Sequence, residues 1–372
     1  MRKVGIAELP LHYGHVPLWL LNRMRKLSAS ILTIIIEEYG QEELLRRISN
    51  PFWFQAFGCV IGHDFHSSGI TTTVCAVLKS VVKPEAHGLG VAGGKGKHSR
   101  KTLDEIEKIS ETFNLSTKKA DSLKYSSRMS AKVDNTAIQS GYPLYQHTFF
   151  LTEKGKWAVV QQGLNINDRT ARRYHWLSDQ VKSFVEEPHS AICCDIKKEN
   201  VLDMTSKQSK EARRISVDLV REGPRRIKND LLLLRPIYQK SLKEFLSVET
   251  KKDFVVRTLR MPKNVNWKAI EEAYELQPEN YENLLSIKGI GSATVRSLAL
   301  ISEIIYGKQV SWEDPKKFSF CLGGKDGVPY PVNKKHYDEV IQTLEDFIKS
   351  ANIEKREKLK ALERLTKFKD KL

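Results

Sequence analysis

Apolar residues recur at helical spacing in the first fifty residues of the chain. The runs from Leu18 to Leu27 and from Ile31 to Tyr39 both have apolar side chains three and four positions apart, and Gly40 follows the second run. This spacing predicts helical segments with one buried face, the second of them ended by glycine. The aromatic cluster that follows Pro51 is expected to join the same core rather than to stack on bases.

A second pattern, rich in aromatic and β-branched residues, predicts strands. Leu144–Leu151 and Trp157–Gly163 are two such runs, and the segment between them contains Gly155. Strand-forming runs about a short glycine-containing turn are typical of a β-hairpin.

Near the C-terminus, the pattern returns to two helices with a glycine corner between them. An apolar run ends at Ile287, a helix is expected from Ser292 to about Tyr306, and Pro278 is expected in the first turn of the preceding helix. Gly289 and Gly291 are both expected at positive φ. The segment resembles the helix-hairpin-helix motif of DNA repair proteins, and the alternative is an ordinary pair of helices joined by a glycine turn.

The resemblance implies contact with a sugar-phosphate backbone, because free amide groups and the dipole at a helix start favour phosphate. The residues expected to make this contact are Lys288, Gly289, Gly291, Ser292, Thr294 and Arg296.

Together these elements predict an α+β protein, with an N-terminal mixed α/β domain built on a β-hairpin and a C-terminal all-α helix-hairpin-helix domain. The expected divisions are an α/β domain at 1–205, a helical connection at 206–255, the helix-hairpin-helix domain at 256–350 and a basic helical tail at 351–372.

The net charge of the chain indicates the class of its binding partner. The chain of 372 residues has 61 Lys and Arg against 45 Asp and Glu, a formal net charge of +16. This balance favours a polyanion, and we expect DNA, with RNA not excluded; a generic basic protein with solvated lysines is the alternative. The chain shows neither a signal peptide nor an apolar run long enough to span a bilayer, and its five cysteines form no disulfide or metal framework. We therefore expect a cytoplasmic protein without a membrane partner; its oligomeric state is left open.

Two further basic groups are candidates for phosphate contact. One follows the glycine-rich segment 88–96 and comprises Lys95, Lys97, Arg100 and Lys101, in a pattern that lacks the Walker spacing for ATP. The other is Arg172 and Arg173, followed by the aromatic rings of Tyr174 and Trp176. The alternative for the second group is an amphipathic strand with aromatic core positions.

One short cluster has the residue types of a metal or acid–base site. His63, Asp64 and His66 lie within four residues and could hold a divalent ion, Mg²⁺ or Mn²⁺, or act in proton transfer. A structural loop in which Asp64 accepts from backbone amides is the alternative. Further groups that could join such a site are His98, Asp134, His147 and His175.

The chain as a whole resembles an uncharacterised domain-of-unknown-function family found mainly in archaea and thermophilic bacteria. The resemblance rests on 63–69, Gly93–Gly96, 157–163, 171–176 and the C-terminal helix pair. It implies a cytoplasmic protein with a fused helix-hairpin-helix and carries no activity.

A local resemblance to helix-hairpin-helix DNA glycosylases concerns Asp314, which follows the glycine corner at the distance of their catalytic Asp. The position of their catalytic Lys is occupied by Ala293, so lyase chemistry is not implied.

Three functions follow as hypotheses. The first is a DNA repair or processing enzyme, a metal-dependent nuclease, with His63, Asp64, His66 and His175 as catalytic groups. The second is a glycosylase that uses Asp314. The third is a DNA-binding or architectural protein without catalysis.

Overall fold

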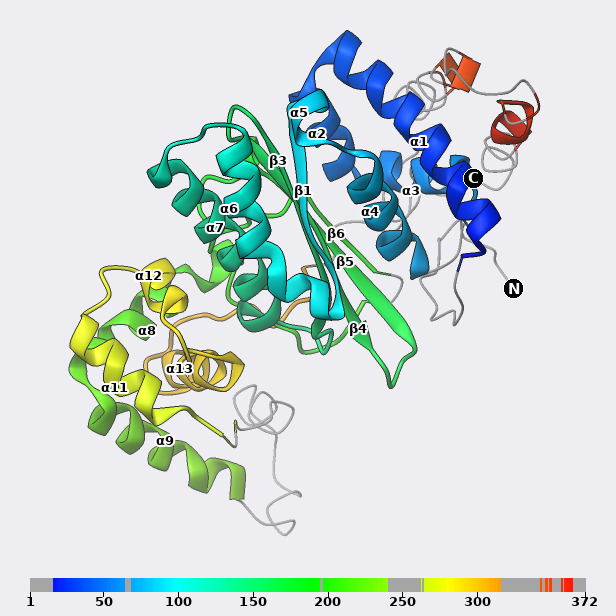
Figure 1. The fold of residues 1–372 in the computed structure, drawn as a ribbon. Helices are drawn as coiled ribbons and strands as arrows, with labels where there is room; N and C mark the ends of the chain where they lie inside the picture. The colour runs from blue at the N-terminus through cyan, green and yellow to red at the C-terminus, as the bar shows by residue number, and fades with distance from the viewer. Residues whose placement is uncertain are drawn as a thin grey trace, which may run out of the picture.

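A five-stranded antiparallel sheet, with the strand order β1-β3-β4-β5-β6, occupies the centre of the molecule (Figure 1). The computed structural model describes residues 16–63, 68–194, 197–239, 262 and 264–315, together with 342, 345–346, 348–349, 356 and 358–363. The strands of the sheet are β1 (Leu89–Lys95), β3 (Leu144–Thr152), β4 (Trp157–Asn165), β5 (Thr170–Leu177) and β6 (Ala191–Cys193).

The predicted hairpin is confirmed as β3 and β4. Its turn contains Gly155 at φ +73°, a backbone conformation that glycine adopts without steric cost. Val160 on β4 faces one core and Val159 faces the other, since successive side chains of a strand point to opposite faces. Both faces of the sheet are therefore buried, which explains why these strands have no solvent-facing polar side.

Helices from the N-terminal part of the chain cover the first face. They are α1 (Leu18–Tyr39), α2 (Gln41–Ser49), α3 (Pro51–Val60) and α4 (Gly69–Val81). The two predicted apolar runs form one continuous helix, α1, which ends at Gly40 as expected. The side chain of Asn50 caps α3 by accepting from the amides of Phe52 and Trp53, and the aromatic cluster of this helix lies in the core.

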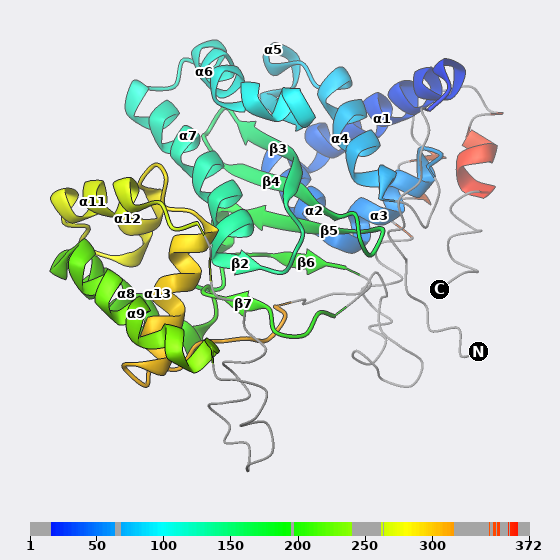
Figure 2. The same cartoon turned by 90° about the horizontal axis from the view of Figure 1, so that it is seen from below.

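The second face is covered by α6 (Thr102–Thr112) and α7 (Thr117–Lys132) (Figure 2). The chain passes from the short helix α5 (Pro84–His87) through β1 into a 3₁₀ segment, η1 (Gly96–Lys101), before α6. A π-helical turn, η2 (Val133–Ala137), then links α7 to β2 (Ile138–Gln139), which pairs with β7 (Leu202–Asp203). The remaining short 3₁₀ segments are η3 (Ser178–Gln180) and η4 (Lys207–Ser209).

A group of helices from the C-terminal half packs beside α7 (Figure 2). They are α8 (Lys210–Glu222), α9 (Pro224–Gln239), α11 (Trp267–Leu276), α12 (Tyr281–Ser286) and α13 (Ser292–Ile304). One apolar cluster runs from the second face of the sheet into these helices and includes Trp176, Leu219 and Leu298. The mixed class of helix and antiparallel sheet is thus confirmed; the proposed domain limits remain predictions, and 240–261 and most of the tail lie outside the described residues.

Among the described residues, every helix is too short or too polar to cross a membrane. Cys59, Cys75, Cys193 and Cys194 are buried thiols. Burial raises the pKa of the Cys75 thiol to about 12, so this side chain stays protonated.

Candidate functional site

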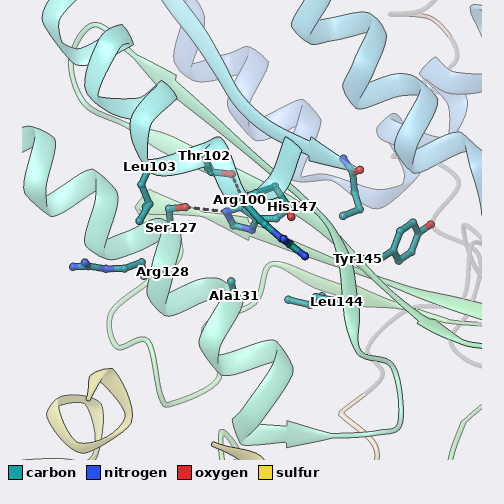
Figure 3. A pocket seen from close by; sticks show the side chains of 11 residues that line it. Arg100, Thr102, Leu103, Ser127, Arg128, Ala131, Leu144, Tyr145 and His147 are labelled. Atoms are coloured by element: carbon teal, nitrogen blue, oxygen red, sulfur yellow. Dashed lines mark hydrogen bonds between the residues drawn. The ribbon is translucent and has the colours of Figure 1, made fainter. Parts of the chain in front are cut away.

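A pocket of about 310 Å³ opens between the start of α6, the C-terminal half of α7 and the beginning of β3 (Figure 3). Its lining combines apolar and cationic side chains with two groups that can move a proton. Those two groups are Ser127 on α7 and His147 on β3, and the cations are Arg100 and Arg128.

Ser127 and His147 are joined by a hydrogen bond that the dashed line in Figure 3 marks. The distance between Ser127 Oγ and His147 Nε2 is 2.9 Å, and both side chains are largely buried. On the other side of the ring, His147 Nδ1 lies 2.7 Å from Gln161 Oε1 on β4.

The orientation of Gln161 decides the tautomer of His147. The amide nitrogen of Gln161 donates to the carbonyl of Ser130 at 2.9 Å and to the carboxylate of Asp134. Its oxygen must therefore face His147 and accept the Nδ1 proton. His147 Nε2 then carries the lone pair and accepts from the Ser127 hydroxyl, which is the arrangement of a serine beside a general base oriented by a third group.

Asp134 holds this chain of contacts in place from the core. Its carboxylate accepts from Gln161, from Trp176 Nε1 at 2.9 Å and from His189 Nε2. The π-helical turn that carries Asp134 rotates it toward the sheet, and such turns recur at functional sites. The sequence names Asp134 as a group that could join a metal or acid–base site, and the structure gives its carboxylate partners on β4 and β5.

The predicted basic loop lies along the rim of the pocket. Lys95, Lys97, Arg100 and Lys101 are all exposed on β1 and η1, and the Lys95 ammonium lies 5.9 Å from the centre of the Tyr145 ring. Because Arg100 lines the pocket itself, the structure brings one member of this loop next to Ser127 and His147.

The turn between α12 and α13 lies beside the last residue of α7. Gly289 has φ +89°, as predicted, but Gly291 has φ −111°, an ordinary extended value, so the prediction of positive φ there is wrong. The position of Pro278 is also corrected, because α12 begins at Tyr281 and is capped by Asn280. Lys288, Gly289 and Ser292 are exposed at this turn.

Two of the predicted contact residues at this turn are engaged within the protein. The side chain of Thr294 is buried and does not reach the surface. Arg296 donates from Nε to Gln139 at 2.8 Å, and its guanidinium lies 5.7 Å from the centre of the Trp312 ring. Lys288 is therefore the exposed cation of the turn.

Direct contacts fasten this turn to α7 and β2. Lys132, the last residue of α7, donates from Nζ to the Ile287 carbonyl at 3.3 Å, and Gln139 donates to the Ser292 carbonyl at 2.8 Å. Burial lowers the pKa of the Lys132 ammonium. Because Arg128 lies one helical turn before Lys132, α7 connects the pocket to the turn across about 6 Å of helix rise.

The structure corrects the prediction that Arg172 and Arg173 contact phosphate at the surface. Both are fully buried on β5 and point to opposite faces of the sheet. Arg172 donates to Asp314 at 2.6 Å and lies over the Tyr142 ring, whereas Arg173 donates to Gln55 at 3.0 Å. Neither guanidinium is available to a nucleic acid in this conformation.

Two of the predicted catalytic residues are buried as well. His175 is fully buried, with Nδ1 at 3.1 Å from the Ile48 carbonyl. The Asp314 carboxylate accepts from Arg172 and from the Lys198 amide at 2.7 Å, and no part of its side chain is exposed. Both side chains lie away from the pocket, and the structure gives them roles in packing.

The predicted metal cluster lies largely outside the described residues. His63 is partly exposed at the end of α3, where its amide donates to Gly58, but Asp64 and His66 are not described. Within the described part of the chain, no three His, Cys, Asp or Glu side chains gather as a metal site. The divalent-ion site stays a prediction.

Two buried histidines give an expected pH dependence. Burial lowers the pKa of His147, and burial together with the nearby Arg173 lowers the pKa of His175 well below 6.5. The unfolded chain binds these protons near pH 6.5, so the stabilisation is complete above that pH and is lost as the pH falls below it. Each imidazole contributes a slope of up to about 1.4 kcal/mol per pH unit.

The measurement is the free energy of unfolding in urea between pH 7.5 and 5. In His175→Asn, which keeps a donor toward Ile48, the dependence on pH should be shallower by up to about 1.4 kcal/mol per unit. Equal slopes for the variant and the parent would contradict this assignment.

The sequence named His147 and Asp134 but missed Ser127, Gln161 and Arg128 as parts of one site. The pattern of core-facing positions along α7 indicates that Ser127 is buried and needs a partner. On α7, Ala120 and Leu123 face the core, and Ser127 and Ser130 continue that face with polar groups. Polar residues at core-facing positions of a helix need partners. The Ser127 hydroxyl has its partner on the sheet, in His147, whereas the Ser130 hydroxyl donates to the Ser127 carbonyl at 3.0 Å.

An antiparallel sheet between two helical layers, with a proton-transfer pair in a basic pocket, describes an α+β protein with a candidate site for an anion. The chain belongs to a family whose model matches residues 5–332 and is described as protein of unknown function (DUF763). No curated protein and no solved structure shows significant similarity to the chain.

Proposed function

We propose that this protein binds the sugar-phosphate backbone of DNA along α7 and cleaves phosphodiester bonds in it. The observation that carries the proposal is the placement of two anion-attracting features at one helix. The pocket with Arg100 and Arg128 lies against the C-terminal half of α7, and the exposed turn at Lys288 lies beside the last residue of this helix.

The chemistry of both features suits a backbone rather than base edges. No side chain caps the start of α13, so amide groups there are available to a phosphate oxygen. A strand of DNA advances about 3.4 Å per nucleotide, so the two features are separated by a few nucleotides. The net charge of +16 supports a polyanionic partner.

Lys288→Glu tests the binding. Loss of one phosphate contact should weaken duplex binding and reduce the slope of log K against log salt by about 1. Gly291→Glu should act in the same direction by repelling phosphate, and it should fold, because a Cβ there meets no atom closer than 3.9 Å. The measurement is fluorescence anisotropy with a labelled DNA duplex over a series of salt concentrations, with a matched RNA duplex as competitor.

Lys26→Glu on α1 is the matched control, since it makes the same change of charge at an exposed position on the other side of the sheet. The affinity of this control variant for the DNA duplex should fall much less than that of Lys288→Glu. Equal affinities and salt slopes for Lys288→Glu and the parent protein would overturn the proposed contact.

A further inference from the structure

We propose that Ser127 is a nucleophile that forms a covalent phosphoryl intermediate, with His147 as its general base. The residue acts in the pocket beside Arg100 and Arg128. The choice of a phosphodiester as substrate rests on the proposed function, whereas the reactivity of the serine rests on the geometry of the pocket alone.

The donors and acceptors from Gln161 through His147 to Ser127 have a fixed direction. Gln161 presents its oxygen to His147 Nδ1 because its nitrogen is committed to Ser130 and Asp134. The basic nitrogen of the ring therefore lies on the side of the Ser127 hydroxyl, at 2.9 Å. A serine that served structure alone would need no base held in one tautomer by two further layers of contacts.

The serine and the histidine also lie where a substrate can reach them. Ser127 and His147 both line it, and two exposed guanidinium groups border the same space. Arginine binds phosphate oxygens in a bidentate manner and stabilises the charge that develops on them during displacement. The pocket thus has a nucleophile, a base and cations for an anionic ester.

Ser127 Oγ attacks phosphorus, the bond from phosphorus to the leaving oxygen breaks, and the serine proton passes through His147 Nε2 to that oxygen. Water then attacks phosphorus, gives its proton to His147, and the Oγ–phosphorus bond breaks as Ser127 regains the proton. The net reaction is hydrolysis of a diester to a monoester and an alcohol.

Burial lowers the pKa of the His147 imidazole, so its base form is already dominant at neutral pH. The rate of attack by Ser127 should therefore be level near pH 7 and above, and it should fall only in more acidic solution.

The test uses the full chain and a tagged alkyl fluorophosphonate, which an activated serine attacks with release of fluoride. Peptide mass spectrometry should find the phosphonyl adduct on Ser127, and Ser127→Ala should not be labelled. Ser126→Ala is the matched control, because Ser126 is the neighbouring buried serine of α7 and bonds to the Ser122 carbonyl instead. Its labelling rate should equal that of the parent, whereas His147→Gln should be slower by about 100-fold or more.

A second arm measures release of nitrophenolate from bis(4-nitrophenyl) phosphate, which Ser127→Ala should lack and Ser126→Ala should retain. Absence of the adduct on Ser127 in the folded parent protein would overturn the nucleophile. Labelling without diester hydrolysis would overturn the choice of substrate. The fluorophosphonate reacts with the protein in the absence of DNA, so a failure of DNA binding is distinguishable from a failure of the serine chemistry.

Discussion

Asp314→Ala should lower the free energy of unfolding by about 3–5 kcal/mol, the cost of breaking a buried ion pair by removing one partner. The carboxylate accepts from Arg172 and from the Lys198 amide, and neither side chain of the ion pair is exposed. The variant leaves the Arg172 guanidinium buried without its counter-charge, beside the Tyr142 ring. Urea unfolding followed by circular dichroism measures the loss.

The control for this prediction removes both charges. Arg172→Met combined with Asp314→Leu should be more stable than Asp314→Ala alone, because two apolar groups replace the pair and no charge stays buried. A parental stability for Asp314→Ala would show that the contact has no structural role. The result also bears on the glycosylase hypothesis, since a carboxylate that is committed to Arg172 and hidden from solvent is not placed to assist a leaving base.

Gly93→Ala should lower the free energy of unfolding by about 2–5 kcal/mol. Gly93 has φ +90°, and left-handed backbone costs a side chain about 1–2 kcal/mol. A Cβ would also lie 2.3 Å from the carbonyl oxygen of His147 and 2.7 Å from Thr102 Oγ1, and such overpacking costs about 1–3 kcal/mol. The loss is measured by urea unfolding, as for Asp314→Ala.

Gly96→Ala is the matched control in the same glycine-rich segment. Its φ is +56°, but a Cβ there meets no atom within 4 Å, so the cost is the backbone strain alone, about 1–2 kcal/mol. Losses of equal size in the two variants would contradict the role given to close packing at Gly93. Because Gly93 faces the backbone of His147, its replacement should also slow the labelling of Ser127.

The features predicted most accurately from the sequence are those that local contacts decide. The helix α11 spans Trp267–Leu276, and the Asn266 side chain caps it by accepting from the Ala269 amide at 3.2 Å, a contact between residues three apart in the sequence. The turn of the β3–β4 hairpin follows from Gly155 in the same way. The sequence predicts the start of α12 too early, because Asn280, two residues after Pro278, is the better cap.

The errors concern features that distant parts of the chain decide. Alternation of arginine with aromatic residues at 172–176 has the same appearance in an exposed strand and in a buried one. Burial of β5 follows from its place between β4 and β6, with helices on both faces. The partners Asp314 and Gln55 are more than a hundred residues from Arg172 and Arg173, so no local pattern reveals them.

The candidate site was found only in part for the same reason. His147 and Asp134 have the residue types of proton transfer and were named for it. Ser127 gains its role from a hydrogen bond that crosses from α7 to β3, and Gln161 gains its role from one that joins β4 to β3.

The contact between Lys132 and the Ile287 carbonyl has a consequence for any long substrate. Since Lys288 and Ser127 belong to one continuous part of the structure, α7 and the turn bonded to it, the distance between them is fixed by the fold. A polymer held at the turn would meet the pocket after a set number of repeat units. Cleavage would then occur at a fixed distance from the held end, and all fragments that include this end would have the same length.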